Sequence, residues 1–142
     1  MSGSGCPLEG RWRIARTITD LRAGRDAAFT GTALIARDPE AGDGSLTWHE
    51  DGRLVSAAHA GRAERRLRIV PAGPAWEVLF ADGRPFHPLD LRTGRCEVLH
   101  PCGADRYAGL YALAADGALR IEWRVTGPAK DMLIAGAYRP WP

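Results

Sequence analysis

Apolar and polar side chains alternate along most of this chain in short stretches. Within residues 10–18, for example, Trp12 and Ile14 fall on one face together with Arg16. A two-residue period is typical of a β-strand that packs one face against a core, because successive side chains point to opposite faces of a sheet. No stretch keeps a 3.6-residue period over three turns, and the best helical candidate is a single turn at residues 7–10. The pattern therefore predicts an all-β fold with little helix.

Turn-forming residues punctuate the chain at intervals of roughly 9 to 13 residues, which is typical of many short antiparallel strands. The strongest signal is Asp51 followed by Gly52, a dipeptide that favours a two-residue hairpin turn between two strands. The stretches between turns predict about ten or eleven strands, at residues 10–18, 27–36, 45–50, 53–59, 65–70, 76–80, 86–91, 96–102, 106–112, 119–126 and 132–138.

So many strands in one small domain would expose long unpaired edges unless the sheet closes on itself. We therefore expect a single domain, residues 1–142, built as a closed or nearly closed antiparallel up-and-down β-barrel of roughly eight to ten strands. A sandwich of two sheets is the alternative. Residues 1–7 precede the first expected strand, and we expect them to form a flexible N-terminus.

The composition narrows the class of protein and its partners. A net charge of +2 over 142 residues is too small to indicate a nucleic-acid partner. No apolar run approaches the roughly 20 residues that cross a membrane, and the N-terminus lacks the basic and apolar regions of a secretory signal. The three cysteines form no C-x-x-C pair, which favours a reducing compartment. We expect a cytoplasmic protein whose partner is a small molecule, with neither nucleic acid nor membrane as a partner, and we leave a homodimer open.

The densest basic stretch lies at residues 62–68, with the sequence RAERRLR. Alternation places Arg62, Arg66 and Arg68 on one face of a strand, and it places Arg65 mostly on the other face with the apolar residues that follow. We interpret the first face as a solvated surface of the sheet rather than as a binding surface.

Groups that could do chemistry are concentrated in residues 97–111, EVLHPCGADRYAGLY. On an extended strand His100 and Cys102 share a face, and so do Tyr107 and Tyr111. Pro101 and Gly103 favour a bend that separates the two halves of this stretch. We expect a strand, a corner and a second strand that together line one cavity.

Two kinds of chemistry are possible for this cluster. His87, His100 and Cys102 are a nitrogen and sulfur set that suits Zn²⁺, with Asp105 or water as a fourth ligand. Alternatively, Cys102 could act as a nucleophile with His87 as its base. The metal set matches no known ligand spacing, and the chain offers little helix and few cations that would activate a cysteine. The sequence therefore assigns no metal and no catalytic residue, and it leaves any cofactor unknown.

Gly127 to Lys130 resemble a phosphate-binding loop only superficially, because the G-x-x-x-x-G-K-[ST] pattern is absent. A tight turn at the barrel rim is the better interpretation, with Lys130 and Arg139 available to an anionic group. Aromatic side chains with a few fixed polar groups are typical of a ligand cavity. The expected ligand-binding residues are therefore His87, His100, Cys102, Tyr107, Tyr111, Trp123, Lys130 and Arg139.

The start of the first expected strand resembles a known family pattern. Gly10-Arg-Trp12 is similar to the G-x-W opening of lipocalin-like (calycin) barrels, in which the tryptophan packs across the closed end. Further motifs resemble an uncharacterised bacterial family of small lipocalin-like domains, a domain family of unknown function: Phe29-Thr-Gly31, Trp48-His-Glu50-Asp-Gly52, Phe80-Ala-Asp82-Gly-Arg84-Pro-Phe86-His87, His100-Pro-Cys102, Asp105-Arg-Tyr107, Trp123-Arg-Val125-Thr-Gly127-Pro128-Ala-Lys130-Asp131 and Tyr138-Arg139.

The resemblance spans residues 8–139 and implies a fold and a pocket, but no activity. Nitrobindins are haem-binding relatives by shape, with a proximal histidine near the C-terminus. This chain has no histidine after His100, which counts against a nitrobindin type of haem site.

The sequence thus predicts that a small, partly polar or anionic ligand binds in the barrel cavity. Two alternatives remain open. The chain could be a small enzyme that uses the His, Cys, Tyr and Asp cluster as acid and base groups. It could also be a filled barrel that serves as a protein-interaction module.

Overall fold

The computed structural model describes residues 5–142, which form ten strands and no helix. These residues therefore contain no helix that is long and apolar enough to cross a membrane. The strands are β1 (Gly10–Asp20), β2 (Arg25–Arg37), β3 (Leu46–Ser56), β4 (Ala60–Ala72), β5 (Ala75–Phe80), β6 (Pro85–Leu89), β7 (Arg95–Cys102), β8 (Asp105–Leu113), β9 (Leu119–Thr126) and β10 (Asp131–Pro140). The predicted all-β class is confirmed.

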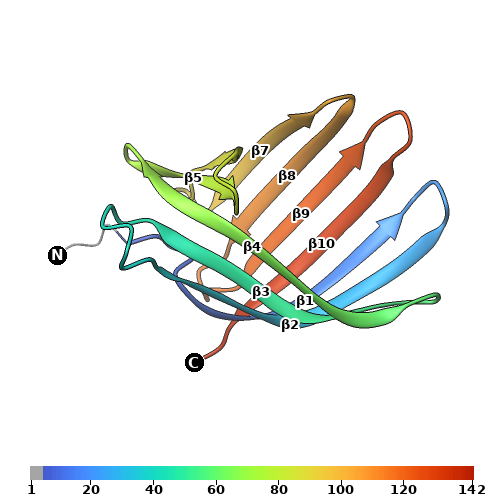
Figure 1. The fold of residues 1–142 in the computed structure, drawn as a ribbon, viewed down its shortest axis with the longest axis horizontal. Coiled ribbons are helices and arrows are strands. Elements are labelled where there is room, and N and C mark those ends of the chain that lie inside the picture. Colours follow the sequence, from blue (N-terminus) through green and yellow to red (C-terminus); the bar gives the residue numbers. More distant parts are fainter. Residues whose placement is uncertain (1–4) are drawn as a thin grey trace.

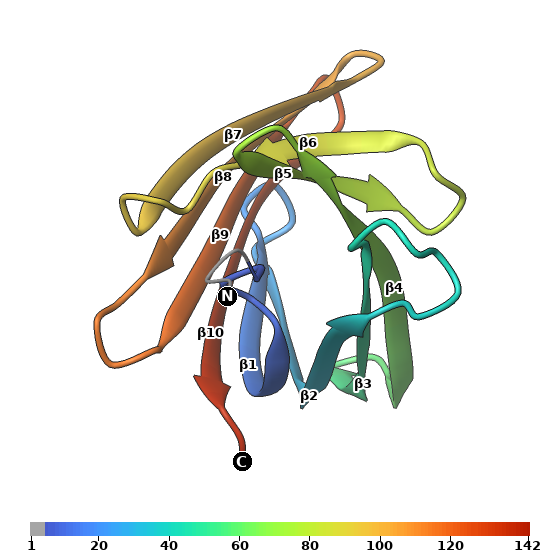
Figure 2. The ribbon, with the colours of Figure 1, turned by 90° about the vertical axis from the view of Figure 1, so that its left-hand side faces the viewer.

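All ten strands belong to one antiparallel sheet, in the order β6-β5-β4-β3-β2-β1-β10-β9-β8-β7. Each strand pairs with its neighbour in the chain except at β6 and β7, which are the two edges of the sheet, and β1 also pairs with β10 and so joins the two halves. The sheet curls until its two edge strands, β6 and β7, come together without forming a ladder (Figures 1 and 2). The predicted nearly closed up-and-down barrel is confirmed, and the two-sheet sandwich is not what forms.

Aromatic side chains close the seam between β6 and β7, where backbone hydrogen bonds are missing. Phe86 of β6 stacks on Trp123 of β9 with ring centroids 5.2 Å apart, and it meets the ring of His100 of β7 edge-on at 5.2 Å. Phe80 of β5 also stacks on Phe86, with ring centroids 4.5 Å apart. Because these rings come from both sides of the seam, their packing holds the edges together.

The two ends of the barrel differ. The hairpin turns that follow β1, β3, β5, β7 and β9 lie at one end, which we call the open end. Residues 5–9 and the loops that follow β2, β4, β6 and β8 lie at the other, which we call the closed end. Here Trp12 is buried, at 4% exposure, and its Nε1 donates a hydrogen bond to the carbonyl of Leu8 at 2.9 Å.

The N-terminal segment contributes to the closed end. Residues 1–4 of the expected flexible N-terminus lie outside the described residues. Within the described part, Cys6 is buried, and its carbonyl accepts a hydrogen bond from the Glu9 amide at 3.1 Å. This contact forms a turn at the position where a short helical turn was considered.

One turn prediction is wrong. Asp51 and Gly52 do not form a hairpin turn but lie inside β3, which runs unbroken to Ser56. Gly52 pairs with Gly31 across β2 and β3, and a Cβ atom on Gly52 would lie 2.2 Å from the Thr30 carbonyl oxygen. Glycine is therefore required at this position by the close approach of β2 and β3. The strands expected at residues 45–50 and 53–59 form the single strand β3.

Trp12→Ala should lower the free energy of unfolding by about 3–5 kcal/mol, because it removes a large buried aromatic side chain. Urea denaturation at neutral pH measures this loss. Trp141, which is 37% exposed, provides the matched control, and Trp141→Ala should cost less than about 1 kcal/mol. A loss of similar size in both variants would show that Trp12 does not anchor the closed end.

Candidate functional site

A buried carboxylate lies at the centre of a polar network inside the barrel. Glu50 of β3 is 1% exposed. It accepts hydrogen bonds from Arg16 Nη2 of β1 at 2.9 Å, from Trp48 Nε1 at 3.0 Å and from Arg65 Nη2 of β4 at 3.2 Å. The hydroxyl of Tyr138 of β10 donates a fourth hydrogen bond to the same carboxylate. We call these five residues the Glu50 network.

Strand register and one glycine bring the Glu50 network together. Glu50 is the direct cross-strand partner of Arg65, so β3 and β4 place the two charges side by side. Arg16 pairs with Gly136 of β10, and a Cβ atom there would lie 3.2 Å from the Tyr138 ring and 3.7 Å from Arg16 Nε. The missing side chain leaves space for the guanidinium to reach Tyr138, whose hydroxyl accepts a hydrogen bond from Arg16 at 2.6 Å.

The electrostatics leave the network with an excess positive charge. Burial raises the pKa of Glu50, but Arg65, Arg16 and the hydrogen bond from Tyr138 outweigh burial and hold this pKa below its ordinary value of 4.5. Glu50 is therefore ionised at neutral pH. Burial raises the pKa of Tyr138, so its phenol stays neutral. Two guanidinium groups thus face a single carboxylate, and the network carries one net positive charge.

A cavity lies between this network and the open end of the barrel. It consists of two adjoining hollows of about 190 and 150 Å³, which share Arg16, Ile18 and Arg65. Apolar side chains form most of the walls, and the guanidinium groups form the polar floor. We call it the open-end cavity. The first hollow is also lined by Ile121, Trp123, Ile134 and Tyr138, and the second by Phe29, Glu50, Leu54, Ala63 and Glu64.

Five of the residues predicted from the sequence to bind a ligand do come together. His87, His100, Tyr107, Tyr111 and Trp123 contact one another through ring packing in the interior and at the seam, with ring centroids between 5.2 and 6.5 Å apart. Only Trp123 of these five also lines the open-end cavity. The cluster therefore forms one wall and the packed interior behind it, rather than a polar pocket.

His87 is fully used as a structural group. It is 2% exposed, its Nδ1 donates to the Pro88 carbonyl at 2.7 Å, and its Nε2 accepts from the Tyr111 hydroxyl at 3.1 Å. Burial lowers the pKa of His87 to about 4, against the opposing effect of the Pro88 carbonyl. The imidazole is therefore neutral near pH 7, and both of its nitrogens already have partners, so it is poorly placed to act as a general base.

The other three predicted contacts lie elsewhere. Cys102 is exposed at the end of β7. Lys130 lies in the turn between β9 and β10 at the open-end rim, with its Nζ 3.1 Å from Asp105 Oδ2. Arg139 is exposed on the outward face of β10, opposite Arg13 in the register. None of the three lines the open-end cavity. Among residues 5–142, no three His, Cys, Asp or Glu side chains are arranged to hold a metal ion.

The sequence interpretation did not select Arg16, Glu50 and Arg65. The signal was present, because alternation placed Arg16 and Arg65 on the apolar faces of their strands and Glu50 two residues after Trp48. A charged residue on an otherwise apolar face either has a partner or lines a cavity. Nothing in the sequence indicated that three such residues from different strands meet.

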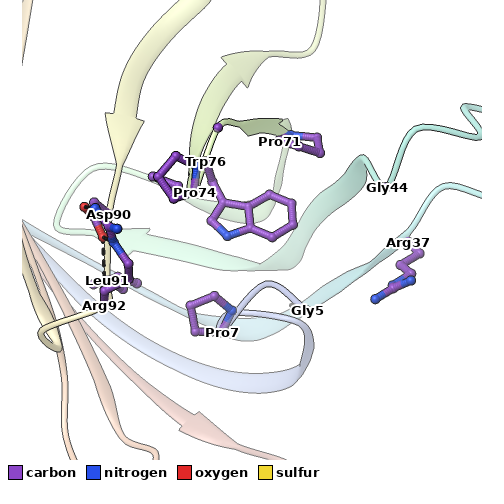
Figure 3. Close-up of a pocket in the computed structure, with 12 residues that line it drawn as sticks. Gly5, Pro7, Arg37, Gly44, Pro71, Pro74, Trp76, Asp90, Leu91 and Arg92 are labelled. Carbon is purple, nitrogen blue, oxygen red and sulfur yellow. Dashed lines mark hydrogen bonds and ion pairs between the residues drawn. The ribbon is translucent and has the colours of Figure 1, made fainter. Parts of the chain in front are cut away.

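A third hollow, separate from the open-end cavity and of about 560 Å³, lies outside the barrel at the closed end (Figure 3). The indole of Trp76 projects into it between Pro74 and Pro7. Its charged side chains are already paired or exposed: Arg92 bonds Asp90 at 2.6 Å and is 63% exposed. No buried charge faces this hollow, so the open-end cavity is the stronger candidate for a ligand site.

Comparison with known protein families identifies the family of this chain. It belongs to a family of unknown function, DUF6314, whose profile matches residues 8–140. The resemblance to an uncharacterised family of lipocalin-like domains is therefore confirmed. A search of curated proteins finds no match.

Among solved structures, the chain resembles the S-type phycobiliprotein lyase CPES from Guillardia theta. The two share 10% sequence identity, with a TM-score of 0.59 over 93% of this chain and 86% of the lyase chain. At this identity the likeness concerns the fold alone, and it supports the lipocalin-like barrel.

The burial of neutral His87 should make folding sensitive to acid. An unfolded imidazole titrates near 6.5 and the folded one near 4, so between these pH values the unfolded state binds more protons and stability falls as the pH decreases. The full loss is about 3 kcal/mol. Urea unfolding at pH values from 7 to 4 measures the decrease in the free energy of unfolding. This decrease should be smaller by about the same amount in His87→Gln than in the unmodified protein.

His59→Gln, at an exposed position in the turn between β3 and β4, controls for the removal of an imidazole from the surface. If His87→Gln and the unmodified protein lose stability in parallel over this pH range, His87 is not held neutral in the folded state.

Proposed function

We propose that this protein binds a small, partly polar or anionic organic ligand in the open-end cavity of its barrel. The single observation that carries the proposal is a cavity with apolar walls and a charged floor, built on the otherwise packed interior. Apolar walls with a few oriented polar groups are typical of small-molecule sites. Trp123 is the residue from the sequence-based site that we retain as a ligand contact, and Arg16 and Arg65 are the polar contacts that we add.

Cavity size and access support this proposal. Each hollow alone is smaller than the roughly 300 Å³ at which sites for drug-sized ligands begin, so we expect a small ligand that spans both. Arg65 is 42% exposed and Arg16 is 14% exposed. The floor is therefore reachable from solvent. The architecture shared with the phycobiliprotein lyase is consistent with a ligand inside a barrel and names no ligand for this chain.

Acid–base catalysis is less well supported by the same residues. His87 is buried and both of its nitrogens are hydrogen-bonded. Cys102 is exposed at the end of a strand, and Asp105 is paired with Lys130. We therefore propose binding rather than a reaction. Cytoplasmic location stays a prediction, and a homodimer stays open.

Filling the cavity should abolish binding without unfolding the barrel. Ile134 lines the first hollow and is the cross-strand partner of Trp123, so Ile134→Trp should place an indole where a ligand would lie. With 1-aminoanthracene as a neutral fluorescent probe, we expect saturable binding to the unmodified protein and a loss of at least about tenfold in affinity in the variant, since direct steric exclusion removes more than about 1.4 kcal/mol.

Leu133→Trp is the matched control, because Leu133 is the neighbouring residue on the outward face and is 42% exposed. It should bind the probe as the unmodified protein does. If both variants bind the probe equally, or if the protein binds neither this probe nor the eight-carbon probes described below, the cavity is not a ligand site and a filled barrel that serves as an interaction module becomes the better interpretation. Thermal melting of both variants verifies that they are folded.

A further inference from the structure

We infer that the ligand is an organic monocarboxylate with an apolar body, and that its carboxylate binds to Arg16 and Arg65 on the cavity floor. This inference rests on the proposed function and specifies its ligand class. It follows from the hydrogen-bonding capacity and the charge of the floor, and from the walls above it.

The carboxylate of Glu50 already accepts four hydrogen bonds from the protein. Its Oε1 accepts from Arg16, and its Oε2 accepts from Trp48, Arg65 and Tyr138. Glu50 is also 1% exposed, so its carboxylate offers a ligand little surface. The carboxylate therefore fixes the two arginines in place and is not itself the group that a ligand would contact.

The guanidinium groups, in contrast, have donors to spare. A guanidinium carries five N–H donors. Arg16 directs both of its side-chain hydrogen bonds from Nη2, to Glu50 and to Tyr138, and Arg65 directs one from Nη2 to Glu50. Within residues 5–142, the remaining N–H groups of both side chains bond no protein acceptor. Arg16 and Arg65 line both hollows, so these donors border the space a ligand would occupy.

The sign and size of the charge select a monoanion. Two guanidinium groups and one ionised carboxylate leave one positive charge on the floor. Among the described residues, the only other charged side chain in the lining of the two hollows is Glu64, which is 43% exposed and whose charge is balanced by Arg62 and Arg66, at 3.8 and 3.9 Å from its Oε2. A carboxylate carries a single charge and accepts two parallel hydrogen bonds from guanidinium groups, which matches this floor better than a neutral or doubly charged group does.

The walls select an apolar body. Above the arginines the cavity is bordered by Ile18, Ile121 and Ile134 on one side and by Phe29, Leu54 and Ala63 on the other. None of these side chains offers a hydrogen bond, so a ligand that fills this space is stabilised by burying apolar surface. A carboxylate at one end and an apolar remainder satisfy both parts of the cavity.

The test compares two probes of equal length that differ in charge, octanoate and octanamide, by titration calorimetry. Octanoate should bind at least about tenfold more tightly than octanamide to the unmodified protein. Arg65→Gln should remove most of this difference, because it removes the more exposed of the two guanidinium groups. Arg66→Gln, the adjacent outward-facing position at 64% exposure, is the matched control and should retain the full preference.

Glu50→Gln gives a second readout of opposite sign. It removes the only negative charge of the Glu50 network, so octanoate should bind more tightly while octanamide changes little, provided that circular dichroism shows the variant folded. Were it unfolded, the comparison of Arg65→Gln with Arg66→Gln would still decide the question.

The inference is overturned if octanamide binds as tightly as octanoate, or if Arg65→Gln keeps the preference for octanoate. The proposed function survives that result as long as 1-aminoanthracene binds and Ile134→Trp excludes it. A protein that binds neither the fluorescent probe nor either eight-carbon compound refutes both the inference and the proposed function.

Discussion

The buried carboxylate of Glu50 is the constraint on which the interior of the barrel depends. An ionised carboxylate at 1% exposure is tolerated only when charged and polar partners surround it, and removal of one partner from such a pair typically costs about 3–5 kcal/mol. Its partners come from β1, β3, β4 and β10, which include the strand pair that joins the two halves of the sheet. The network therefore fixes the curvature of the barrel and the position of the two arginines together.

Closure of the barrel follows from a different kind of interaction. The ladder is missing between β6 and β7, and stacked rings from both sides of the seam fill its place. The aromatic and histidine residues that attract attention in the sequence are thus committed to closing the barrel and to packing behind the cavity wall. Trp123 contributes both to the seam and to the cavity wall, since it stacks on Phe86 and also lines the open-end cavity. Closure and the shape of the candidate site are linked through this residue.

These two features divide the interior into a packed half and an open half. The closed end is filled by Trp12, Leu8 and the residues around them, and it is bordered on the outside by the hollow at Trp76. The open end keeps space above a charged floor. A barrel of this size can either fill with side chains or hold one small ligand, and this one does the first at one end and has the geometry for the second at the other.

The sequence by itself determined the fold class, most strand positions and the buried role of Trp12, because the two-residue period and the turn residues are local signals that the sheet obeys. It also placed Arg16 and Arg65 on inward faces. It misplaced the turn at Gly52, because close approach of two strands and a hairpin turn both require glycine.

Only the tertiary structure decided which inward residues meet. Register across β3–β4 and β1–β10 brings Glu50 to both arginines, and closure brings His87 to Tyr111, whereas Arg139 and Cys102 are carried away from the cavity. Such contacts join residues far apart in the chain, and no local pattern encodes the register that aligns them.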